Sequence, residues 1–136
     1  VGSEMCIRDR FRTYPLVNDY MKFKKLVEEK NVDCYIINTG DFMGKKVKPK
    51  DTLGVIEAVV DGTANFKQWG PFTDIEINEW EGFVPDMNDA AYVEQLKARM
   101  LDRLTYVKNL ETNNEGYDKL PEDAMDAIRK VVDQLG

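Results

Sequence analysis

Apolar side chains recur at three- and four-residue spacing in four stretches of the chain, with charged residues between them. This period is the signature of an amphipathic helix, so the pattern predicts four helices. Pro15 and Asn18 suit the start of the first helix, and Gly62 suits the end of the second. The predicted helices cover residues 18–30, 51–62, 88–110 and 121–135.

Two shorter stretches have the pattern of strands. Residues 32–38 are rich in β-branched and aromatic side chains and end at Thr39-Gly40, which predicts a buried strand. Residues 74–78 alternate apolar and polar side chains, as a half-exposed strand does. A helix, a strand and a glycine loop in succession indicate an α/β layer, so we expect a mixed α/β (α+β) fold.

Composition narrows the classes of function. The chain has 136 residues, a net charge of −6 and no long basic run, which argues against binding to nucleic acid or to an anionic membrane. It contains no histidine, which excludes imidazole bases and zinc sites that need imidazole. Cys6 and Cys34 lack C-x-x-C spacing, which favours a reducing compartment and a cytoplasmic protein. No apolar run approaches the roughly 18–20 residues of a membrane span.

The first ten residues, VGSEMCIRDR, match the translation of a common transposase-based sequencing adapter. We therefore expect residues 1–10 to be an artefact joined in frame to a truncated gene. On this interpretation residues 11–136 are the carboxy-terminal fragment of a longer protein.

Two features could bind a ligand, and each has a simpler explanation. A lysine cluster follows Gly44 just before a predicted helix start, where ammonium and backbone N–H groups could hold an anion, although such runs are usually solvated loops. Asn38-Thr39-Gly40 follows a predicted strand, where α/β proteins collect ligands, although it could be only a turn. The lysine cluster consists of Lys45, Lys46, Lys48 and Lys50.

Other side chains offer weaker signals. Trp69 and Trp80 could stack on a base, but aromatic residues near a Gly-Pro turn more often pack in a core. Acidic pairs such as Glu28-Glu29 lack the spacing of a calcium loop, and we expect them to lie on the surface. The chain has no G-x-x-x-x-G-K-[ST] phosphate-binding loop.

One stretch resembles a known family. The motifs I-N-T-G at 37–40, G-K-K-V-K-P-K-D-T at 44–52 and I-E-A-V-V-D-G at 56–62 are similar to the carboxy-terminal region of ATP-dependent phosphoenolpyruvate carboxykinase. The resemblance covers roughly residues 14–110. It differs from the family pattern in a shorter loop after Gly40, in Asp41 where tryptophan is usual, and in Lys46 where arginine is usual.

The resemblance implies that residues 11–110 are part of the P-loop-containing nucleotide-binding domain of a carboxykinase and that residues 111–136 are a connector and a final helix. It also implies a role on the adenosine side of an ATP site for three residues. Lys46 would lie against the base, Val47 would form the pocket wall, and Thr52 would hydrogen-bond near the sugar.

The reaction implied by the resemblance converts oxaloacetate and ATP to phosphoenolpyruvate, ADP and CO₂, with a divalent metal, Mg or Mn. The phosphate loop, the metal ligands and the catalytic groups of the family lie upstream, so we expect no catalytic residue here and no activity of the fragment alone. Two alternatives remain. The departures at Asp41 and Lys46 favour a kinase-like paralogue with another substrate, and the lysine cluster would suit a non-catalytic nucleotide-binding or interaction module.

Overall fold

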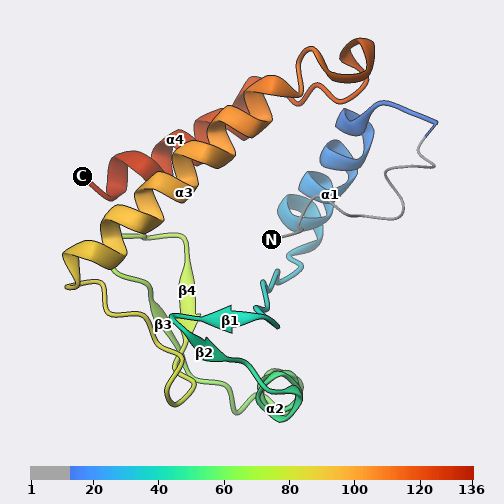
Figure 1. The fold of residues 1–136 in the computed structure, drawn as a ribbon. Coiled ribbons are helices and arrows are strands. Elements are labelled where there is room, and N and C mark those ends of the chain that lie inside the picture. The colour runs from blue at the N-terminus through green and yellow to red at the C-terminus, as the bar shows by residue number, and fades with distance from the viewer. Residues whose placement is uncertain (1–12) are drawn as a thin grey trace. The chain divides into compact units, whose positions relative to one another are not determined.

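The computed structural model describes residues 13–136, which form four α-helices and two small antiparallel sheets (Figure 1). The predicted adapter residues, 1–10, lie outside the described residues. None of the described helices is long and apolar enough to cross a lipid bilayer. The helices are α1 (Leu16–Lys30), α2 (Pro49–Val60), α3 (Ala90–Asn109) and α4 (Glu122–Gln134). The strands are β1 (Asp41–Phe42), β2 (Lys45–Lys46), β3 (Phe66–Gln68) and β4 (Glu76–Asn78).

All four predicted helices are confirmed, which supports the prediction of a mixed α and β fold. The first helix begins directly after Pro15, and Asp89 caps α3 because its carboxylate accepts a hydrogen bond of 2.9 Å from the Ala91 N–H. The start predicted for the second helix, residue 51, is two residues too late. Pro49 occupies the first turn of α2, where its missing N–H costs nothing. The end of α2 is as predicted, with Gly62 at a φ of 69°.

The buried strand predicted for residues 32–38 is wrong. This segment is irregular, and its side chains are exposed, with Ile36 fully so. A strand becomes stable only beside a partner that takes up its backbone N–H and C=O groups, and no described strand pairs with these residues. The strand was predicted from the composition of the segment, and composition does not show whether a second strand lies beside it.

The chain divides into two compact units, and each is described separately. The first unit contains residues 13–33 and 99–132. In it, the Leu16 N–H donates a 2.8 Å hydrogen bond to the Tyr117 carbonyl, directly after η2 (Asn113–Gly116), a turn of 3-10 helix. Lys24 of α1 forms an ion pair with Asp123 of α4. Leu110 and Met125 are the buried apolar side chains found here.

The second unit contains residues 34–98 and 133–136 and holds both hairpins and α2. Strands β1 and β2 are joined by Met43 and Gly44, which have φ angles of 47° and 78°. Two consecutive positive φ values match the type I′ turn that the twist of a two-residue hairpin favours. The second hairpin pairs Phe66 with Asn78 and Gln68 with Glu76. Its long loop contains Phe72, which is 1% exposed and packs against the Trp69 ring.

Candidate functional site

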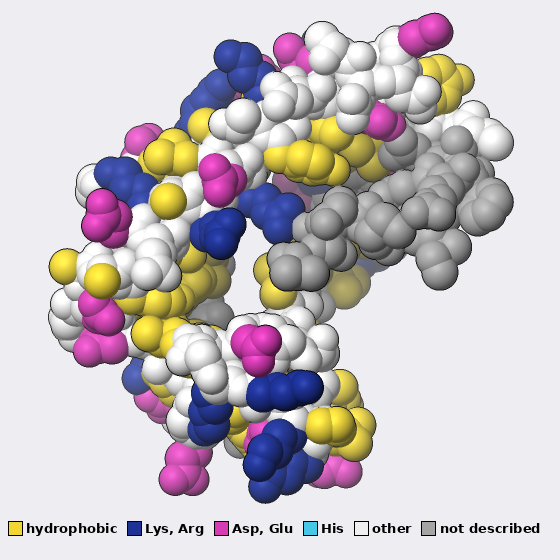
Figure 2. Space-filling view, viewed as in Figure 1, with side chains coloured by type: hydrophobic (Ala, Val, Ile, Leu, Met, Phe, Trp, Pro, Cys, Tyr) yellow, Lys and Arg dark blue, Asp and Glu magenta, His cyan; other side chains and the backbone are white. Residues whose placement is uncertain are grey.

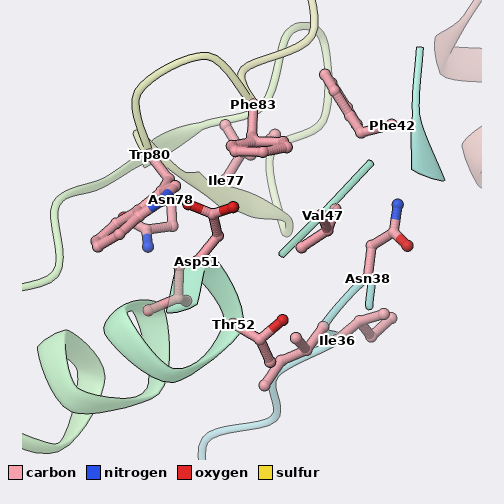
Figure 3. Close-up of a pocket in the computed structure, with 12 residues that line it drawn as sticks. Ile36, Asn38, Phe42, Val47, Asp51, Thr52, Ile77, Asn78, Trp80 and Phe83 are labelled. Atoms are coloured by element: carbon pink, nitrogen blue, oxygen red, sulfur yellow. The ribbon is translucent and has the colours of Figure 1, made fainter. Parts of the chain in front are cut away.

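The second unit contains a pocket of about 230 Å³ (Figure 3). Its lining comes from the segment before β1, from the β1–β2 hairpin, from the first turns of α2 and from β4 with the loop that follows. This volume lies below the roughly 300–1,000 Å³ of a pocket that encloses a whole drug-sized ligand, so it suits one part of a larger ligand. The lining residues are Ile36, Ile37, Asn38, Phe42, Val47, Asp51, Thr52, Val55, Ile77, Asn78, Trp80 and Phe83.

The lining is mostly apolar and includes three aromatic rings, those of Phe42, Trp80 and Phe83. The Phe42 and Phe83 rings meet edge to face, with centroids 6.1 Å apart. The Lys45 ammonium lies 4.1 Å from the centroid of the Phe83 ring, a cation–π contact, and donates a 3.4 Å hydrogen bond to the Gly82 carbonyl. An aromatic, apolar pocket of this kind is suited to a planar heterocycle.

Trp80 lies against helix α2 because residue 54 is glycine. A methyl group added at Gly54 would come within 2.9 Å of Cη2 and 3.0 Å of Cζ2 of the indole ring. Only a residue without a side chain lets the ring approach the helix this closely. Gly54 therefore sets the position of the Trp80 wall of the pocket.

Two polar side chains of the pocket already have partners in the chain. The Asn38 oxygen accepts a 2.9 Å hydrogen bond from the Gly40 N–H, and its amide nitrogen donates one of 3.1 Å to the Asp41 carbonyl. The Asp51 carboxylate accepts a 3.0 Å hydrogen bond from the Lys48 N–H and so caps α2. These two groups shape the pocket walls, and their hydrogen-bonding capacity is partly used.

Asn78 differs from them. Its amide nitrogen is buried and has no hydrogen-bond partner among the described residues. The backbone at this position is held firmly, because Asn78 pairs with Phe66 in the hairpin and its carbonyl accepts a 2.9 Å hydrogen bond from the Trp80 N–H. A buried donor without an acceptor is unfavourable and is uncommon in native structures.

The structure brings together two of the three residues that the sequence singled out. Val47 and Thr52 both line the pocket, and in Figure 3 the Thr52 hydroxyl points toward Val47 across it. Lys46 is exposed and does not line the pocket. Successive residues of an extended segment face opposite sides, so the side chain of Lys46 leaves β2 on the side away from Val47.

The remaining lysines of the cluster are exposed, and Figure 2 shows basic side chains gathered over β2 and the start of α2. Sequence reasoning noted Asn38 and Trp80 as weak candidates and missed Phe83 and Asn78. The regular alternation through residues 74–78 was a signal for the strand that carries Asn78. Nothing in the sequence showed that this strand faces the start of α2.

The lining offers groups for binding rather than for bond breaking. It has one carboxylate, one hydroxyl and two carboxamides, and none of these forms a nucleophile–base pair in the structure. Over residues 13–136 there is no cluster of three or more acidic, thiol or imidazole side chains that could hold a metal ion. The described residues therefore offer no ligand set for a divalent metal, and we assign the metal no role in this pocket.

No protein-family model matches this chain, and no solved structure matches it at a significant level.

Proposed function

We propose that this chain is the carboxy-terminal part of an ATP-dependent phosphoenolpyruvate carboxykinase and that its pocket holds the adenosine end of ATP. One observation carries the proposal. Val47 and Thr52, selected from a motif, line the same pocket as Asn38 of the I-N-T-G motif, although Asn38 is fourteen residues from Thr52 in the sequence. Their meeting in one pocket supports a common role for the motif residues.

The pocket's chemistry supports this role. Val47 and Ile77 offer apolar contact to the face of a base, and Trp80 and Phe83 add aromatic surface. The Thr52 hydroxyl supplies a donor and an acceptor for a sugar or a base edge. The same chemistry would serve a kinase-like paralogue, so the substrate assignment to oxaloacetate depends on the resemblance alone.

The chain's contribution to the reaction is binding and orientation. The lining supplies neither a phosphate-binding loop nor a cation for a carboxylate substrate, so the reacting groups of a carboxykinase have to come from other parts of the enzyme. Binding the adenosine end holds the phosphates in place without touching the reacting phosphorus.

The test uses the complete enzyme that carries this segment. Thr52→Ala removes one hydrogen bond, so we expect the KM for ATP to rise about two- to tenfold with kcat nearly unchanged. Thr63→Ala is the matched control, because its hydroxyl bonds only the Ala58 carbonyl at the end of α2 and does not line the pocket. Equal KM values for Thr52→Ala and Thr63→Ala would contradict the proposal, and so would the absence of oxaloacetate-dependent ATP consumption.

The resemblance assigns three residues to the adenosine site, and Lys46 is the one that does not line the pocket. The variant Lys46→Ala tests its contribution. Because Lys46 leaves β2 on the side away from Val47, we expect its loss to raise KM less than the loss of Thr52 does. A larger rise for Lys46→Ala would contradict the arrangement of the pocket described above.

A further inference from the structure

We infer that Asn78 is the residue that determines which base the pocket accepts, and that it selects adenine through its side-chain carboxamide. This inference rests on the proposed function, and it names the residue that makes the same pocket specific for one base. Its starting point is the amide nitrogen of Asn78, which is buried and has no partner among the described residues.

Of the two carboxamides in the lining, only that of Asn78 has a nitrogen that makes no hydrogen bond among the described residues. Both ends of the Asn38 amide are engaged within their own turn, at 2.9 and 3.1 Å. A ligand would have to break that turn to recruit Asn38. Recruiting Asn78 would break no hydrogen bond of its amide nitrogen and would satisfy a donor that is otherwise unpaired.

Asn78 also has a fixed backbone and a side chain that can turn. Its place in the ladder opposite Phe66 and the hydrogen bond from the Trp80 N–H hold the main chain, while the terminal torsion of an asparagine is soft. In the structure the amide nitrogen is shielded, so recruitment requires the amide to rotate until its nitrogen and its oxygen both face the cavity. A site built on a strand in this way positions a hydrogen bond more accurately than a loop would.

A carboxamide is matched to adenine by its donor–acceptor pattern. Its oxygen accepts from the exocyclic N6 amine, and its nitrogen donates to an adjacent ring nitrogen, which gives two parallel hydrogen bonds. The Watson–Crick edge of guanine presents the O6 acceptor beside two donors, N1–H and the N2 amine, and these two neighbouring donors suit a carboxylate better. The nearby rings of Trp80 and Phe83 bind any base by stacking, so the choice between bases is left to the polar group.

The experiment titrates the 136-residue chain with AMP and with GMP and follows ¹H–¹⁵N spectra, which measure weak affinities and resolve the Asn78 side-chain amide. We expect AMP to shift the Asn78 amide and Trp80 indole signals and to bind more tightly than GMP. In Asn78→Asp the ratio of AMP to GMP affinity should fall about fivefold to hundredfold, the range for one bidentate pair. Asn18→Asp makes the same change at an exposed position outside the pocket lining and should leave the ratio unchanged.

Asn78→Leu provides a second variant with a different signature. It deletes the unpaired donor, so the melting temperature should not fall, yet AMP binding should weaken and the preference for AMP over GMP should disappear. An unchanged ratio in Asn78→Asp and Asn78→Leu, with Trp80 still responding to AMP, overturns the inference and leaves the proposed function standing. If neither nucleotide shifts any signal of the pocket in the parent chain, the proposed adenosine site is wrong and the inference falls with it.

Discussion

The contact between Gly54 and Trp80 leads to a quantitative prediction. In helix α2, replacing glycine by alanine should stabilise the helix by about 1 kcal/mol, because alanine loses less conformational freedom on folding. Here the new methyl group would come within 2.9 Å of the indole ring. Overpacking of this kind typically costs about 1–3 kcal/mol. The two effects oppose each other, and we expect Gly54→Ala to change stability by between about 0 and 2 kcal/mol in the destabilising direction.

A double-mutant cycle separates the two effects. Phenylalanine at position 80 lacks the outer part of the indole, which carries the two atoms that the methyl group would meet. In a Trp80→Phe background, Gly54→Ala should therefore stabilise the chain by about 0.5–1 kcal/mol, the helix-propensity gain alone. The coupling energy between the two positions should reach about 1–3 kcal/mol.

The measurement is urea denaturation of the parent chain, both single variants and the double variant, followed by far-ultraviolet circular dichroism with the m-values compared. A coupling energy within about 0.3 kcal/mol of zero would refute the packing of Trp80 against α2, since independent sites add to within that margin. It would also remove the basis for placing Trp80 in the pocket wall.

Three further predictions follow from the packing and the charges. Phe72→Ala should lower the free energy of unfolding by about 3–5 kcal/mol, because this side chain is buried. Phe66→Ala, which removes a half-buried ring, should lower it by less. Equal losses in denaturation curves would contradict a core at Phe72. The hydrogen bond from Lys24 holds the pKa of Asp123 below its usual value, so the stability it provides is present above that usual value and is lost as the pH falls through the lowered one. Lys24→Met should raise the pKa of Asp123, which carbon-detected NMR titration of its carboxyl group checks; an unchanged pKa would refute the pairing. Finally, exposed apolar side chains such as Ile36, Val60 and Phe23 should make the chain associate as its concentration rises. Light scattering that finds only monomer, together with a sharp, cooperative melt, would refute this.

The helices could be predicted because their signals are local. Residues 18–30 and 121–135 carry apolar side chains on one face and charges on the other, and that pattern needs no knowledge of the rest of the chain. The prediction of a strand at 32–38 failed because a strand exists only where a second strand accepts its hydrogen bonds. The β1–β2 hairpin was missed for a related reason. Each of its strands has two residues, which is too few for an alternating pattern. The feature that defines its turn, the positive φ of Met43 and Gly44, is seen only in the structure.

The pocket shows the same division between local and distant information. Val47 and Thr52 were found because the motif that contains them is continuous in sequence. Asn78 and Phe83 were missed because they lie more than twenty residues after the motif and join the pocket only through the fold. Lys46 was singled out because it matches the arginine of the family motif, and it lies outside the pocket lining because extended backbone points neighbouring side chains in opposite directions. A motif can therefore locate a pocket, whereas the role proposed for Asn78 comes from its side-chain amide nitrogen, which lacks a partner among the described residues.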